Sequence, residues 1–460
     1  MNNEQNVQAP VPAPPPPMWR GFLKFLGPMV LANILQSLSG TINGVFIGQM
    51  LGTKALAAVA GVFPLVFLFI SLVIGLGAGA SVLIGQAWGA RDVHKVKAIA
   101  GTALAIGLFL GLAIALFGGF FTEALLHVLG TPPDVLAEAT RYARFIMIAM
   151  PGLLVFLLAT QLMRGVGDTV TPLLALVLST AVSCITTPAF IRGWFGLPQL
   201  GVMSAAAATT ASFLVALAFL TVYMRARKHP LAPDAELMRN LKVDPKLLRL
   251  VVRIGLPSGV QMIVLSLAEV VLLKIVNGFG SDATAAYGAV NQVVNYVQFP
   301  ALSIAITASI LGAQAIGAGR ADKLGDITKT GLVLNVVLTG TLVVIGYLFS
   351  RHLMALFITS EPVVEVAQTL LHIMLWSSVI FGFASVTSGV MRASGAVLVP
   401  TAISIVCIAV VELPSAYVLS RLYGLNGVWM AYPIAFTSML VLQGAYYRLV
   451  WRKKKIERLV

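Results

Sequence analysis

The chain has 460 residues, of which 58% are hydrophobic and only 10% are charged, and its mean hydropathy is +0.93. A soluble domain carries about 25% charged residues, so this composition excludes a soluble globular protein. The apolar runs are about 20 residues long, the length that an α-helix needs to cross a bilayer, whereas barrel strands are about half as long. The sequence therefore predicts an all-α membrane protein.

The formal net charge is +14, from 31 Lys and Arg against 17 Asp and Glu. The positive residues gather in segments such as 225–253 and 448–455, an asymmetry typical of cytoplasmic loops. We therefore expect a multi-pass membrane protein with both termini in the cytoplasm. The basic segments are then topology signals and contacts for anionic lipids, and no nucleic-acid partner is expected.

The chain begins with a Pro-rich tail, residues 1–20, which we expect to be disordered and cytoplasmic because it lacks the charged and apolar regions of a signal peptide. Two groups of six apolar spans follow, an N-lobe over 21–225 and a C-lobe over 250–449. A charged cytoplasmic linker, 226–249, joins them, and a basic tail, 450–460, follows. The expected spans are 22–49, 55–84, 98–121, 142–163, 170–191, 200–224, 250–277, 284–312, 328–350, 366–390, 397–420 and 425–449.

The two halves repeat each other. Residues 85–90 (Gly-Gln-Ala-Trp-Gly-Ala) match 313–318 (Ala-Gln-Ala-Ile-Gly-Ala), and residues 161–172 match 389–400, in both cases at an offset of 228 (313 minus 85). Duplicated halves of a membrane carrier enclose a binding site at their interface and rock about it. The repeat predicts twelve transmembrane helices in two pseudo-symmetric six-helix lobes around a central cavity, complete within a monomer.

Only two of the acidic residues fall inside the expected spans: Glu269 in span seven and Glu412 in span eleven. A carboxylate at membrane depth costs a few kcal/mol, so it indicates a functional site. The alternative is a protonated side chain that bonds a neighbouring helix. Lys274 lies about 140° around the helix from Glu269, and we expect it to extend to the interface instead of pairing.

Polar side chains recur at helical spacing and predict faces that point at protein or water. Such faces line a cavity or, alternatively, join helices through hydrogen bonds. Met262 and Ser266 share the face of Glu269, and Tyr417 is a candidate aromatic wall. The candidate substrate-binding residues are Asn33, Gln36, Asn43, Met262, Ser266, Asn291, Asn295, Gln298 and Tyr417.

Enzyme motifs are absent from the sequence. It has no Walker-type loop, no His-Glu-x-x-His and no Gly-x-Ser-x-Gly. Cys184 and Cys407 lie in different spans and give no metal spacing. We therefore expect no enzymatic activity, no cofactor and no metal site, with ATP excluded as the energy source.

Several ordered motifs together resemble the MATE (multidrug and toxic compound extrusion) family over residues 20–450. They are Arg164-Gly165-Val166-Gly167-Asp168-Thr169…Pro172, the two repeated segments at 85–90 and 312–318, the run 280–288 after span seven, and Gly427-Val428-Trp429. The resemblance implies two six-helix lobes and antiport of organic, often cationic compounds against H⁺ or Na⁺.

The sequence departs from that family's pattern in the first half. Many bacterial members carry an acid in span one where this chain has Asn43, and the fifth-span Asn…Asp-Pro element appears as Ser183…Thr187-Pro188. Glu269 is similar to the seventh-span glutamate of other members. A tenth-span aspartate has no counterpart, and Glu412 is a candidate substitute.

With the resemblance, these observations predict a secondary multidrug or organic-cation exporter of the bacterial inner membrane, driven by proton antiport through Glu269 and Glu412. Sodium coupling in the same fold is one alternative, although few oxygen ligands are evident. A lipid-linked precursor flippase of the same superfamily (the MOP superfamily) is another, but Lys274 is the only Lys or Arg that we expect at membrane depth. A membrane prenyl or acyl transferase is a third, without a visible site. The sequence does not identify the substrate.

Overall fold

A computed structural model describes residues 17–128, 131 and 133–460. Most of the predicted Pro-rich tail, residues 1–16, lies outside the described residues. Within them the chain is helical without strands, and twelve segments are long and apolar enough to cross a membrane. The predicted fold class is thereby confirmed.

The first half contributes six long helices, joined by short turns and one 3₁₀ segment at Trp194–Gly196. Their bounds are α1 (Met18–Leu51), α2 (Thr53–Gly89), α3 (Val93–Val128), α4 (Pro133–Val166), α5 (Val170–Arg192) and α6 (Met203–Ala226). Several extend well beyond the predicted apolar cores, because polar turns continue the helices outside the hydrocarbon. Arg164 therefore lies inside a helix, as does Arg392 in the second half.

The second half repeats this arrangement with two interrupted spans. Short helices α7 (Ala235–Arg239) and α11 (Ser350–Ala355) and 3₁₀ turns at Ala321–Lys323 and Trp451–Lys453 lie between or beyond the spans. The spanning helices are α8 (Pro245–Asn277), α9 (Ser281–Gly317), α10 (Leu324–Leu348), α12 (Glu361–Leu375) with α13 (Ser377–Ala393), α14 (Leu398–Val406) with α15 (Leu413–Tyr423), and α16 (Leu425–Leu449).

Between α14 and α15 the span predicted over 397–420 contains a π-helical segment, Cys407–Glu412. Pro414 follows two residues later. A proline lacks the N–H for the usual bond, and its ring collides with the carbonyl four residues earlier, here that of Val410. The wider π-turn is a common way to accommodate such a defect and is frequent at functional sites. It places Glu412 at the end of the distorted segment.

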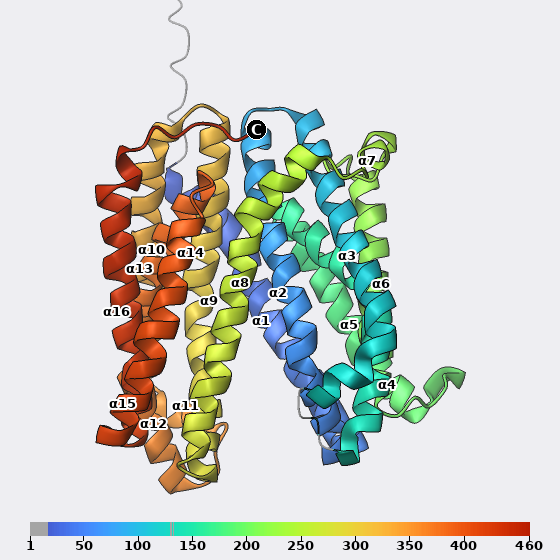
Figure 1. Cartoon of the computed structure of the whole chain (residues 1–460), viewed down its shortest axis with the longest axis vertical. Helices are drawn as coiled ribbons and strands as arrows, with labels where there is room; N and C mark the ends of the chain where they lie inside the picture. The colour runs from blue at the N-terminus through green and yellow to red at the C-terminus, as the bar shows by residue number, and fades with distance from the viewer. Residues whose placement is uncertain (1–16, 129–130, 132) are drawn as a thin grey trace, which may run out of the picture.

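The two halves form two bundles that lie side by side (Figure 1). They converge at the end of the molecule that carries α7, the start of α1 and the C-terminus, which we call the linker end. They diverge toward the opposite end, which we call the far end. The contacts between the bundles come mainly from α2 against α8 and α9, and from α1 against α9.

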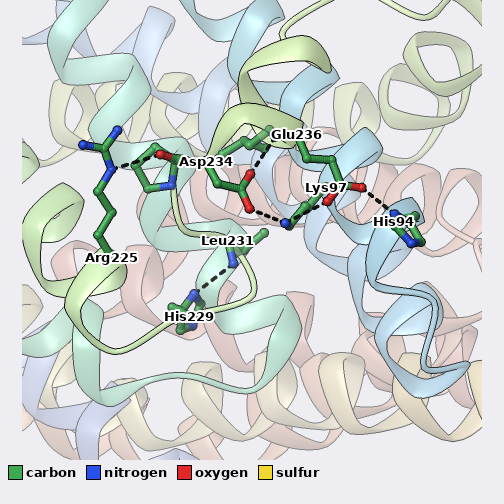
Figure 2. Close-up of polar contacts among 9 residues, drawn as sticks. His94, Lys97, Arg225, His229, Leu231, Asp234 and Glu236 are labelled. Atoms are coloured by element: carbon green, nitrogen blue, oxygen red, sulfur yellow. Dashed lines mark hydrogen bonds and ion pairs between the residues drawn. The ribbon is translucent and has the colours of Figure 1, made fainter.

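The linker packs on the N-terminal bundle (Figure 2). Lys97 on α3 pairs with both Asp234 and Glu236, with a distance of 2.9 Å from its Nζ to Glu236 Oε2. Arg225 Nε donates to the carbonyl of Pro233 at 3.0 Å. The hydrogen bonds from Lys97 lower the pKa of both carboxyls. The predicted linker, 226–249, therefore includes a short helix and the first turn of α8.

Candidate functional site

The two predicted membrane carboxyls lie near each other in the C-terminal bundle. Glu412 is 2% exposed, whereas Glu269 on α8 is exposed. The segments that carry them, α8 and Cys407–Glu412, pack against each other. Neither carboxyl forms an ion pair within the part of the chain that the structure describes. The arrangement combines an accessible acid with a buried one.

Two buried tyrosines complete this cluster. Tyr287 on α9 and Tyr432 on α16 are each 6% exposed, and their hydroxyl oxygens lie 3.3 Å apart. Asn291 lies four residues after Tyr287 on α9 and therefore on the same face of that helix. The helix that carries Tyr432, α16, packs against both α8 and the π-helical segment. The ring of Trp429 packs 5.2 Å from that of Tyr287. We name Glu269, Glu412, Tyr287, Tyr432 and Asn291 the C-lobe cluster.

Tyr287 and Tyr432 were not among the predicted site residues, because the prediction started from carboxyls and recurring amides and took Tyr417 as its one aromatic residue. A phenol in a membrane span is also a polar group that needs a partner when it is buried. Tyr287 and Tyr432 are 145 residues apart, so no local spacing connects them. Their position within predicted spans was the available signal.

The other predicted C-lobe residues differ in their exposure. Met262 and Ser266 are partly exposed on α8, as is Gln298 on α9, whereas Asn295 is exposed. Tyr417 is not brought into the cluster. It lies about 140° around the helix from Glu412, and the Arg421 guanidinium packs 4.6 Å from its ring centre.

The predicted polar face of α1 divides into two parts. Asn33 Nδ2 donates to Ser303 Oγ of α9 at 3.2 Å, so this amide joins the two bundles. Ser37 continues the contact with Tyr296 at 3.5 Å and with Gln292 at 3.4 Å. Gln36 is exposed beside them.

Asn43, farther along α1, belongs to a separate polar site within the N-terminal bundle. Its Oδ1 accepts hydrogen bonds from Ser183 Oγ at 3.1 Å and Thr187 Oγ1 at 3.0 Å, both on α5. The site contains an amide and two hydroxyls, and the resemblance leads one to expect carboxylates at two of these positions, Asn43 and Thr187. Its bonded groups carry no charge that a proton could neutralise.

The chain matches the MatE family model over residues 28–188 and 257–418, one match in each bundle. The chain belongs to the MatE family. MATE proteins are transporters, which eliminates the membrane-enzyme alternative.

Relatives of this MATE protein share nearly its whole length. It is 44% identical to the probable multidrug resistance protein YoeA of Bacillus subtilis over 447 residues, covering 97% of this chain and 96% of the relative. It is 23% identical to the multidrug export protein MepA of Staphylococcus aureus, covering 90% of this chain and 89% of the relative.

Solved MATE structures share the fold. A variant of the Vibrio cholerae MATE transporter VcmN superimposes with a TM-score of 0.88 at 20% identity, covering 95% of this chain and 98% of that one. A MOP superfamily transporter from Pyrococcus furiosus superimposes with a TM-score of 0.86 at 23% identity, covering 95% and 97%.

The MATE motifs at the linker end form a closed seam between the bundles. Gln86 Nε2 donates to the carbonyl of Ala393 at 2.8 Å, and Gln314 Nε2 donates to the carbonyl of Gly165 at 3.1 Å. Donors and acceptors are both related by the offset of 228 (314 minus 86; 393 minus 165). The spacing that is repeated in the two halves thus produces a pseudo-two-fold symmetric contact.

Glycines allow α2 and α8 of this MATE fold to cross closely. A Cβ on Gly75 would lie 2.4 Å from the amide nitrogen of Gly259, and one on Gly79 would lie 2.7 Å from that of Gly255. Each helix thus presents a Gly-x-x-x-Gly pair to the other, an arrangement that permits close packing in membranes. Any larger residue here pushes the bundles apart.

Proposed function

We propose that this MATE transporter exports organic, predominantly cationic compounds and that proton antiport through Glu269 and Glu412 drives it. The multidrug names of YoeA and MepA support the substrate class. The observation that carries the coupling is the pair of carboxyls on two segments that pack together, one exposed and one buried, without a cationic partner among the described residues.

The proposed cycle follows from the repulsion between the two carboxylates. When both are ionised they attract a cationic substrate, which relieves their repulsion. When a proton neutralises one of them, the attraction falls and the substrate leaves. A ligand shifts a conformational equilibrium only through its different affinity for the two states, and competition for the same carboxyls supplies this difference.

The proposal includes an orientation. The linker and the basic C-terminal tail lie at the linker end, and the positive-inside asymmetry places this end in the cytoplasm. The seam closes that end, so the structure corresponds to an outward-facing state. Protons from outside then reach the exposed Glu269 first.

A sodium-driven version has one specific observation in its favour. The C-lobe cluster assembles two carboxyls, two phenols and an amide, which supplies more oxygen atoms than the sequence indicated. Hard cations require several oxygen ligands. The N-lobe site around Asn43 offers an amide and two hydroxyls and no carboxylate, so it has no group that a proton could neutralise.

The test is efflux of a fluorescent organic cation from proteoliposomes under an imposed pH gradient and, separately, a sodium gradient. The variants are Glu269→Gln and Glu412→Gln, and the control is Glu365→Gln, an exposed carboxyl on α12. We expect transport driven by the pH gradient, lost in both variants and kept in the control. Equal transport by all variants would refute coupling through the carboxyls. Transport driven only by the sodium gradient would show that the coupling ion is sodium and not the proton.

A further inference from the structure

A basic cleft lies where the two bundles meet at the linker end. Its volume is about 940 Å³. Arg91, in the turn between α2 and α3, contributes from one bundle, and Arg320, Lys323 and Lys329 contribute from the other. Asp326 is the one carboxyl among the described lining residues, and it pairs with Lys323 at 3.5 Å. Four cations against one anion leave three positive charges in excess.

These charges are accessible and mutually repulsive. All four cationic side chains are exposed, and Arg91, Arg320 and Lys329 have no ion-pair partner within the described part of the chain. Like charges that share a concave surface raise the local positive potential and attract anions. The cleft therefore favours an anionic ligand.

The apolar part of the cleft indicates what kind of anion fits. Trp88, Leu311 and Ile327 line it beside the cations. Lys329 lies at the start of the apolar span predicted over 328–350, the part of a span where basic side chains reach the headgroups. A cleft with a cationic rim and an apolar wall at the membrane surface matches a phospholipid with a charged phosphate better than a soluble anion.

The cleft depends on the closed seam. Gly89 and Gln314 line it, and the same Gln314 donates across the seam to Gly165. A Cβ on Gly89 would lie 2.1 Å from the carbonyl oxygen of Gln314, so the two walls touch at this point. When the bundles separate at the linker end, Arg91 moves away from the other three cations. A ligand that bridges them binds the closed arrangement more tightly and stabilises it.

We propose that this cleft binds the headgroup of an anionic phospholipid and that the bound lipid stabilises the state that is closed at the linker end. The site is separate from the C-lobe cluster and adds a lipid-sensitive control to the transport cycle. Its placement on the cytoplasmic leaflet rests on the proposed orientation, but lipid binding itself does not depend on the coupling ion.

The test uses the full chain in nanodiscs of phosphatidylcholine alone or of an equal mixture with phosphatidylglycerol. Native mass spectrometry measures retained phosphatidylglycerol, and the distance between spin labels at Arg239 and Lys454 reports closure of the linker end. The variants are Arg320→Gln and Lys329→Gln. The matched controls are Lys242→Gln and Lys246→Gln, basic residues of the linker and the start of α8 that do not line the cleft.

We expect each cleft variant to reduce retention about fivefold, since a basic side chain near an anionic surface contributes this order of affinity. Phosphatidylglycerol should increase the population with the short spin-label distance in the unaltered chain and in the controls, but less in the cleft variants. Equal retention in variants and controls would overturn the site, and an unchanged distance distribution would overturn its effect on closure. If glycerol phosphate in phosphatidylcholine nanodiscs reproduces the closure, the ligand is a soluble phosphate and the lipid assignment is wrong.

Discussion

Gln86 and Gln314 make the same hydrogen bond in opposite directions across the seam, each to a backbone carbonyl of the other bundle. Gln86 is completely buried. The pair forms only while the linker end is closed. Opening therefore leaves both amides and both carbonyls without these partners.

Replacement of Gln86 by Leu should shift the equilibrium away from the closed state. Loss of a buried hydrogen bond costs about 1 kcal/mol, and more when a carbonyl is left unpaired, which corresponds to about a fivefold change in the ratio of the two states. Spin-label distances across the linker end measure this ratio.

The control for this prediction is Gln443→Leu. Gln443 is equally buried, but it donates to Pro400 and Ser404 within one bundle. It should lower the melting temperature without changing the distance distribution. If both variants change the distribution equally, the seam has no special role in closure.

The Gly75–Gly255 contact predicts a steric block. Gly75→Leu places a side chain where even a Cβ would lie 2.6 Å from the Gly255 carbonyl oxygen. Overpacking typically costs 1–3 kcal/mol, and here only separation of α2 from α8 relieves it. We expect transport to fall by at least an order of magnitude. Gly61→Leu on the same helix meets nothing within 4 Å, so it should transport normally, and equal loss in both would contradict a packing origin.

The twelve spans and the two carboxyls within them could be predicted from the sequence, because hydrophobic length and charge at membrane depth are properties of single segments. The proximity of Glu269 to Glu412 was not, since it requires α8 and the π-helical segment to pack together. The π-turn has a local cause in Pro414, yet the sequence alone does not say whether a proline kinks a helix or widens it.

The seam shows a different limit. The repeat of Gln86 and Gln314 was visible at once, but their role was not, because the acceptors are backbone carbonyls 307 and 149 residues away. Asn33 illustrates the ambiguity of amides: its spacing is equally compatible with a cavity and with a helix contact, and the structure shows a hydrogen bond to Ser303.

Asp168 predicts an acid-sensitive contact at the linker end. Its Oδ1 accepts from the amides of Val170 and Thr171 at 3.0 Å and caps α5, while His229 Nε2 of the linker lies 3.5 Å from its Oδ2. His229 Nδ1 accepts from the amide of Leu231, so Nε2 carries the proton in the neutral ring. Burial acts to raise the pKa of Asp168, but the bonds from His229 and Thr171 outweigh it and lower the pKa to about 2.

A carboxyl whose pKa is lower in the folded protein than in the unfolded chain stabilises the fold at pH values above its unfolded-state pKa. This stabilisation is lost as the pH falls through the folded-state pKa. The free energy of unfolding of the unaltered protein should therefore fall by about 2 kcal/mol between about pH 4 and pH 2. Asp168→Asn keeps a capping side chain but should show a smaller loss over this range in thermal unfolding. Asp326→Asn, an exposed carboxyl, is the control, and identical pH profiles for all three proteins would contradict the assignment.

The C-terminal tail should also stabilise the closed seam. The amide of Leu459 donates to Gln86 Oε1 at 2.8 Å, and its side chain packs over Gly395, so the tail of one bundle reaches the buried glutamine of the other. Removal of residues 459–460 takes away this bond and exposes Gln86, so it should increase the open population about fivefold, as expected for about 1 kcal/mol. Lys455→Ala breaks only an exposed ion pair with Glu457, which contributes little, and should leave the distances unchanged. If the truncated chain gives the same spin-label distances as the full chain, the tail contacts the seam without stabilising the closed state.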